Sequence, residues 1–268
     1  MLTPTKSLEG FEIRAPEGVI GTVDDLYFDD QQWHVRYLVI ATGTWLNGRK
    51  VLISSAALAA RQPAVRYFSV DLSFDHVRNG PDIDTAKPVS RQHEEQLHRH
   101  FAWPIYWGGP LVGGGLNPPV GGPAAATASA TGASRRPMAG QSGQVPGGDV
   151  PEAWLEPGDD RFLRSAKAVR NYHIEASDGA VGHVEDLVVD ERSWAVRYLL
   201  IDTRNWWPGK KVAMPPASIS RVSWLESSVW VDLTRDAIKG APAFDEARAS
   251  SLEFADRLDF HFRGTGPK

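Results

Sequence analysis

Hydrophobic and polar positions along the chain predict a β-rich protein, and the clearest pattern runs from Gly21 to Ile40, GTVDDLYFDDQQWHVRYLVI. Runs of β-branched and aromatic residues flank a polar cluster from Asp29 to Gln32, which is typical of two strands joined by a short loop. The stretch therefore predicts a β-hairpin, and both of its faces are largely apolar. Strands that are buried on both faces belong to a closed barrel or a covered sheet.

The same pattern returns from Gly182 to Ile201 as GHVEDLVVDERSWAVRYLLI. The offset is 161 residues (182 minus 21), and it also relates Trp45 to Trp206. A pattern that is repeated at a fixed offset without a gap indicates an internal duplication, in which each copy is one structural unit. We therefore expect two domains with the same fold.

Each copy ends in a segment with helical spacing of its apolar residues. Leu97 and Phe101 lie four residues apart in the first copy, and Leu258 and Phe262 hold the equivalent positions in the second. The sequence thus predicts a mainly β protein, made of two small antiparallel β-barrels that are each followed by a C-terminal helix. The predicted domains span residues 5–101 and 161–262.

Residues 102–160, between the predicted domains, have a different composition. From residue 108 to residue 150 the segment is dominated by Gly, Pro, Ala and Ser, which bury too little apolar surface to fold alone. We interpret it as a flexible linker that begins with an aromatic cluster. The cluster contains Trp103, Tyr106 and Trp107, next to Phe101.

Composition and charge narrow the classes of function. The net charge of −4 argues against a nucleic-acid platform, and the lack of cysteine excludes disulfides and thiolate chemistry. No apolar run approaches the roughly 18 residues of a membrane helix, and the amino-terminal segment lacks a secretory signal pattern. We expect a cytoplasmic protein without a transmembrane segment.

An aspartate and an arginine fall opposite each other in each predicted hairpin if the loop is centred on its polar cluster. This register pairs Asp25 with Arg36 in the first copy and Asp186 with Arg197 in the second. Opposite charges on directly paired residues stabilise a sheet. Because the pair recurs in both copies, we interpret it as a structural ion pair rather than a catalytic one.

No residue set shows the pattern of a catalytic, cofactor or metal site. His93 and His98 lie on different faces of the first C-terminal helix and lack the His-Glu-x-x-His spacing, so this polar helix surface is interpreted as solvated. Glu94 and Glu95 are included in that interpretation.

Aromatic and basic residues beside predicted turns and at the start of the linker are candidates for partner binding, because exposed aromatic groups mark interfaces. A second interpretation stays open for Trp45 and Trp206, which would then fold back over the barrel ends. The candidate partner-binding residues are Trp45, Trp206, Trp207, Lys210, Lys211, Trp103, Tyr106 and Trp107.

Each copy resembles a PRC-barrel domain, a β-barrel module present in the H subunit of photosynthetic reaction centres. The resemblance rests on a Gly-x-Val-x-Asp-Leu strand, a Val-Arg-Tyr-Leu strand and a Trp-x-x-Gly-x-Lys-Val segment. These motifs begin at Gly21, Val35 and Trp45, and again at Gly182, Val196 and Trp206. The resemblance implies a small, mainly antiparallel barrel that serves as a binding platform.

These observations predict a non-enzymatic tandem PRC-barrel protein that mediates protein–protein interaction as a binding or scaffold protein, without a cofactor. Its modules bind a protein partner, pair with each other, or form a homo-oligomer, since duplicated modules often reproduce a homodimer interface. Two alternatives stay open. The resemblance to a ribosome maturation factor implies ribosome or RNA association, and the reaction-centre relative implies a peripheral component of a membrane-associated complex.

Overall fold

The structure is a computed structural model. It describes residues 1–81, 91–107, 163–203, 211–223, 225–245 and 251–263. The described residues are mainly β, as the sequence predicts. Met1–Pro104 and Gly148–Lys268 form one compact unit, which holds both copies of the repeat, and Ile105–Gly147 form a second unit.

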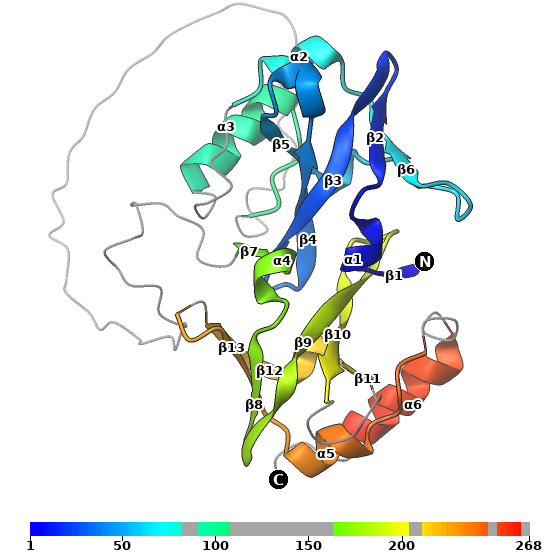
Figure 1. Cartoon of the computed structure of the whole chain (residues 1–268), viewed down its shortest axis with the longest axis vertical. Coiled ribbons are helices and arrows are strands. Elements are labelled where there is room, and N and C mark those ends of the chain that lie inside the picture. The colour runs from blue at the N-terminus through cyan, green and yellow to red at the C-terminus, as the bar shows by residue number, and fades with distance from the viewer. Residues whose placement is uncertain (82–90, 108–162, 204–210, 224, 246–250, 264–268) are drawn as a thin grey trace, which may run out of the picture. The chain divides into compact units, whose positions relative to one another are not determined.

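The sheet of the first copy has the strand order β5-β4-β3-β2-β6 (Figure 1). Neighbouring strands from β2 to β5 are antiparallel, whereas β6 runs parallel to β2. The strands are β2 (Glu12–Ala15), β3 (Gly18–Asp29), β4 (His34–Ala41), β5 (Lys50–Ser54) and β6 (Tyr67–Ser69).

The sheet of the second copy has the equivalent order, β11-β10-β9-β8-β13-β12. Here β13 runs parallel to β8. The strands are β8 (His173–Ala176), β9 (Gly179–Asp190), β10 (Val196–Asp202), β11 (Lys211–Met214), β12 (Ile219–Ser223) and β13 (Ser228–Val231). Two further strands, β1 (Leu2–Pro4) and β7 (Leu163–Ser165), each join the sheet of the other copy.

Short helices connect and cover the sheets. They are α1 (Thr5–Leu8), α2 (Phe74–Arg78), α3 (Arg91–Phe101), α4 (Ala166–Val169), α5 (Arg235–Gly240) and α6 (Leu252–Arg263), with 3-10 turns η1 (Gly43–Leu46), η2 (Ser55–Ala57) and η4 (Pro216–Ser218). The C-terminal helices α3 and α6 confirm the helical pattern at the end of each copy. Their apolar residues Leu97 and Leu258 are both buried.

The prediction of closed antiparallel barrels is not confirmed. Each sheet is mixed, and no ladder joins its two end strands in the part of the chain that the structure describes. In the first copy an isolated bridge between Leu58 and Val70 joins the two ends, beside a hydrogen bond from the Ala59 N–H to the Ser69 carbonyl. In the second copy the 3-10 turn η4 leads directly from β11 to β12, so chain connectivity rather than hydrogen bonding links the two ends.

The register of the first hairpin differs from the predicted one. Val39 lies opposite Asp25, so the predicted pairing of Asp25 with Arg36 is wrong. The loop ends later than its polar composition suggests, because Trp33 adopts a left-handed conformation with φ of 51°. A β-bulge beside Phe28 shifts the pairing further.

The second hairpin shows the same difference. Leu200 lies opposite Asp186, so the predicted pairing of Asp186 with Arg197 is also wrong. Arg197 is exposed. Trp194 has φ of 59°, which shows that the left-handed tryptophan is a shared feature of the two loops.

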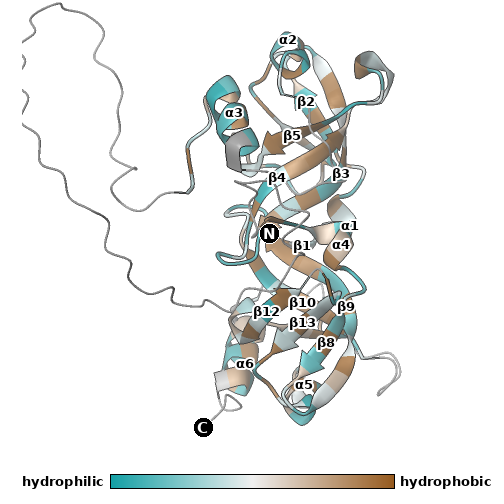
Figure 2. Ribbon diagram, turned by 90° about the vertical axis from the view of Figure 1, so that its left-hand side faces the viewer, coloured by the Kyte–Doolittle hydropathy of each residue, from teal (hydrophilic) through white to brown (hydrophobic). Residues whose placement is uncertain are grey.

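The core is formed mainly by buried residues of the strands, with apolar residues of the C-terminal helices added to it. Figure 2 shows hydrophobic residues concentrated in the strands, and β4 is buried from Val35 to Ile40. The repeated glycines allow two strands to approach each other closely. A Cβ atom on Gly21 or Gly182 would lie 2.3 Å from the carbonyl oxygen of Ala41 or Asp202, respectively.

Candidate functional site at the junction of the two copies

The two copies exchange their first strands. β1 pairs with β9 of the second copy, with Leu2 opposite Asp190, and β7 pairs with β3 of the first copy, with Leu163 opposite Asp29 (Figure 1). The offset of 161 residues relates Leu2 to Leu163 and Asp29 to Asp190. The exchange is therefore reciprocal and follows an approximate two-fold symmetry. We call all contacts between the two copies the junction; it includes the contacts of β1 and α1 with β9, of β7 and α4 with β3, of the two hairpin loops, and of the residues beside these elements.

The hairpin loops meet at the centre of the junction. The backbone N–H of Val35 donates to the carbonyl of Trp194 at 2.8 Å, and that of Val196 donates to the carbonyl of Trp33 at 2.7 Å. The resulting bridge joins His34 to Ala195, which hold the same position in the two copies. A symmetry axis brings equivalent residues together in this way.

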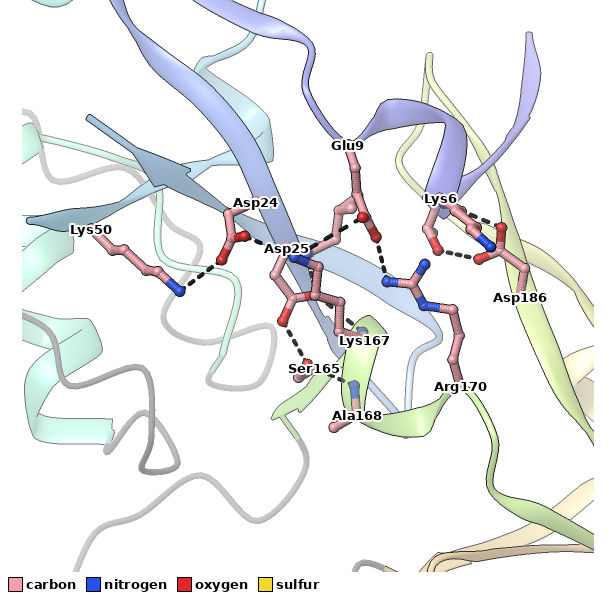
Figure 3. Close-up of polar contacts among 12 residues, drawn as sticks. Lys6, Glu9, Asp24, Asp25, Lys50, Ser165, Lys167, Ala168, Arg170 and Asp186 are labelled. Carbon is pink, nitrogen blue, oxygen red and sulfur yellow. Dashed lines mark hydrogen bonds and ion pairs between the residues drawn. The ribbon is translucent and has the colours of Figure 1, made fainter. Parts of the chain in front are cut away.

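Two buried aspartates hold the exchanged segments. In Figure 3, Asp25 accepts hydrogen bonds from the Ser165 hydroxyl at 2.5 Å and the Lys167 backbone N–H at 3.1 Å. Ser165 in turn caps α4 by accepting from Ala168 at 3.0 Å. Burial raises the pKa of the Asp25 carboxyl, and these hydrogen bonds offset only part of that effect.

Asp186 holds the equivalent segment of the first copy. Its carboxylate accepts from the Thr5 hydroxyl at 2.5 Å and from the Lys6 backbone N–H at 3.1 Å. Burial also raises the pKa of Asp186, against the hydrogen bond from Thr5. The repeated aspartates, predicted as members of cross-strand ion pairs, therefore serve as acceptors for first turns of the opposite copy.

Arg36 has a different partner from the predicted one. Its guanidinium lies 3.1 Å from the carboxylate of Asp29 and also donates to the side chain of Gln32. Both charged side chains are buried. The arginine thus fastens the hairpin loop of its own copy.

Ion pairs surround the buried aspartates. The Lys167 ammonium lies 2.7 Å from Asp24, which also pairs with Lys50 at 2.8 Å (Figure 3). Burial opposes ionisation of Asp24, but the hydrogen bonds from Lys167 and Lys50 lower its pKa below the ordinary value. Arg170 of the second copy pairs with Glu9 of the first.

The loop carboxylates at the equivalent positions 30 and 191 also take part. Arg164 of β7 lies 2.6 Å from Asp30, and Arg61 lies 2.5 Å from Glu191. These four side chains are at most 8% exposed. Charged groups that are this buried need partners, so each pair ties one copy firmly to the other.

The structure places several of the candidate partner-binding residues in structural contacts. Trp45 folds back onto its own copy, where its indole N–H donates to the carbonyl of Ile20 at 2.6 Å and its ring stacks on Phe74. Trp103 is buried and stacks on Phe101 with ring centroids 4.5 Å apart. These contacts agree with the interpretation of Trp45 as a ring that covers the end of its module.

The remaining candidates divide into two groups. Lys211 pairs with Glu185 at 2.8 Å, and Tyr106 and Trp107 are half-buried in an edge-to-face contact. The others, Trp206, Trp207 and Lys210, lie outside the described residues.

A buried polar cluster connects α3 to the first sheet. The interpretation of this helix surface as solvated is therefore wrong for Glu94 and His98. The Tyr37 hydroxyl donates to Glu94 at 2.7 Å and lies 2.8 Å from Nε2 of His98. Glu94 and His98 are both buried. The repeat marks Tyr37 as a recurring position, because Tyr198 is its equivalent in the second copy. It does not mark the partners of Tyr37, because Glu94 and His98 correspond to Ala255 and Asp259.

A cleft of about 400 Å³ opens at the junction beside Asp186, with walls from both copies. Its lining includes Lys6, Lys211 and Phe244. Potential metal-ligating atoms of His183, Glu185 and Asp202 lie within 4.8 Å of one another nearby, but Glu185 is already engaged by Lys211. We assign no metal to this group.

The first copy is thus a β module with a mixed sheet, built around a long hairpin. The hairpin carries the motif residues Gly21 and Val23, followed by the buried Asp25. The family model described as the PRC-barrel domain matches residues 6–71. The match identifies a PRC-barrel domain in the first copy of the repeat. A comparison with curated proteins finds no match. Among the described residues, no helix is long and apolar enough to cross a membrane.

Proposed function

We propose that the chain is a non-enzymatic, cytoplasmic binding or scaffold protein that presents two paired PRC-barrel modules to a protein partner. The junction carries this proposal. Asp25 and Asp186, the repeated acidic groups of the family motif, both accept hydrogen bonds from the opposite copy. Groups engaged in this way hold the two modules together, and the outer surfaces are left for recognition.

The second copy is proposed as a PRC-barrel module on the evidence of the repeat. β8 and β9 have the same bounds as β2 and β3 at the offset of 161 residues, and the parallel pairing of β8 with β13 matches that of β2 with β6. Barrel closure is also part of the proposal. The bridge between Leu58 and Val70 and the direct connection from β11 to β12 support it.

The two alternative functions gain no specific support. RNA association calls for a basic surface, whereas the chain carries a net charge of −4. Membrane association depends on exposed aromatic residues after the first module, and Trp103 of that cluster is buried. Protein binding is therefore the function that we propose.

A capture experiment with the full chain tests this function. The chain is immobilised and exposed to a lysate of its own cells, before and after nuclease treatment. We expect a protein partner that survives nuclease and whose cross-links map to the surfaces of both copies. A bait with Asp25→Ala and Asp186→Ala should lose this partner, because the modules no longer present one surface.

Three results would refute the proposal. Capture that disappears with nuclease would favour RNA, and flotation of the chain with liposomes would favour the membrane alternative. Turnover of a substrate that is abolished by Asp25→Asn in a protein that keeps its fold would show an enzyme.

A further inference from the structure

One ion pair of the junction joins residues that hold the same position in the two copies. Glu9 and Arg170 are related by the offset of 161 residues, and the Arg170 guanidinium donates to the Glu9 carboxylate (Figure 3). Their side chains are 29% and 13% exposed. Like His34 and Ala195, they meet because they lie near the approximate two-fold axis.

A residue beside such an axis faces its own counterpart, so its charge determines which copies can pair. In a pair of two first copies, Glu9 would face a second Glu9. In a pair of two second copies, Arg170 would face a second Arg170. Either arrangement brings like charges together in a partly buried contact, which is unfavourable. The Lys167 ammonium also lies 4.0 Å from Glu9, and in a pair of second copies it would meet Arg170 instead, which adds to the repulsion. Only a first copy with a second copy gives opposite charges at this position.

The remaining described contacts across the junction do not distinguish these pairings by charge. Asp25 and Asp186 both accept from the backbone of an equivalent lysine, which is present in either copy. Positions 30 and 191 are both acidic. In a pair of first copies Asp30 would meet Arg61, and in a pair of second copies Glu191 would meet Arg164, so an arginine is available in each case.

We propose that Glu9 and Arg170 form a specificity element, which makes the two copies pair with each other and prevents either copy from pairing with another example of itself. The interaction surface is the α1 and α4 side of the junction, and its partner is the complementary copy of this repeat. The complementary copy can come from the same chain or from a second chain. The linker favours the same chain, because it makes pairing of the two copies an intramolecular step.

Charge exchange in the full chain tests the proposal. Glu9→Arg places two arginines at the contact, and Arg170→Glu places two glutamates there. We expect each single variant to melt roughly 5 °C below the unmodified chain, since like charges replace an opposite pair. The double variant Glu9→Arg/Arg170→Glu should recover most of this loss.

A mixture of the two single variants distinguishes specificity from simple stabilisation. When they are unfolded and refolded together at about 0.1 mM, pairing between chains restores opposite charges at both junctions, whereas pairing within a chain restores neither. We expect a species of twice the mass in light scattering, which neither variant forms alone. The mixture should also melt above both separate variants.

Glu12→Arg provides a matched control, because it makes the same charge change in an ion pair with Arg14 of its own copy. It should neither lower the melting temperature comparably nor produce the larger species with Arg170→Glu. A double variant whose loss equals the sum of the single losses would overturn the proposal. Recovery in the double variant without the larger species in the mixture would also overturn it, because the pair would then stabilise without selecting partners.

Discussion

The carboxylate of Asp25 accepts the backbone N–H of Lys167 at 3.1 Å, although the two residues belong to different copies of the repeat. The equivalent contact joins Asp186 to Lys6 at the same distance. Two buried carboxylates therefore hold the first turns that follow the exchanged strands. Peptide N–H groups at the start of a helix lack partners within the helix. Each carboxylate therefore accepts a hydrogen bond from such an N–H group of the opposite copy.

Replacement of Asp25 by alanine should loosen the junction. The change leaves the partly buried Lys167 N–H and Ser165 hydroxyl without this acceptor, and we expect a loss of about 1–3 kcal/mol in the free energy of unfolding. Chemical denaturation monitored by tryptophan fluorescence would measure the loss.

The neighbouring residue Asp24 supplies the control for this measurement. Asp24 is 29% exposed and pairs with lysine side chains, so Asp24→Ala should cost less than about 1 kcal/mol. An equal loss in the two variants would show that Asp25 acts only through its charge.

The same aspartates give a pH dependence of defined sign. Burial raises the folded-state pKa of Asp25 and Asp186 above the ordinary value of 3.8. The folded chain then binds more protons than the unfolded chain over the interval above pH 3.8. The contribution of these groups to stability is fully present below that pH and is lost as the pH rises through the raised pKa.

A comparison of variants isolates this contribution, because Asp24 and Asp190 have lowered pKa values and act in the opposite direction. We expect the stability of the unmodified chain, relative to Asp25→Asn/Asp186→Asn, to fall as the pH increases from 3.8. Denaturant titrations between pH 3.5 and about 6.5 would follow the difference. A difference that grows with pH would contradict the assignment.

The sequence predicted features that depend on local pattern. The hairpin was evident because its apolar runs are long, and the buried positions Leu97 and Leu258 could be predicted from helical spacing. The repeated Gly21 and Gly182 mark positions where two strands approach so closely that a side chain would not fit between them. Each of these features follows from residues that are near one another in the chain.

The exchange of strands could not be predicted in this way. β1 and β7 have three residues each, too few for a periodic pattern, and their partners lie more than a hundred residues away. The hairpin register could not be predicted either, because the left-handed Trp33 and the bulge beside Phe28 change which residues lie opposite each other. The burial of Glu94 and His98 depends on Tyr37, a partner that only the tertiary structure supplies.

Trp45 should contribute to stability rather than to recognition. Its ring stacks on Phe74 at 4.7 Å and its N–H donates to the Ile20 carbonyl. We expect Trp45→Ala to cost about 3 kcal/mol, near the low end for loss of a large aromatic side chain because the residue is only half-buried. Trp45→Phe should cost less, since it keeps the stacking and loses the hydrogen bond.

Thermal unfolding and partner capture together would check this assignment. Trp45→Phe should retain the partner of the unmodified chain. Loss of the partner in a Trp45→Phe protein of normal stability would instead support the interpretation of this loop as a binding anchor.

The duplication supplies an internal control for the buried polar cluster under α3. Tyr37 and Tyr198 are equivalent, but the Tyr37 hydroxyl bonds to Glu94 and His98, whereas the Tyr198 ring packs edge-on against Phe254. Tyr37→Phe removes a donor to a buried carboxylate, so we expect a loss of about 1–3 kcal/mol in the free energy of unfolding. Tyr198→Phe keeps its ring contact and should cost less. Equal losses, measured by denaturant unfolding of the two variants, would show that the hydroxyl of Tyr37 contributes no more than that of its counterpart.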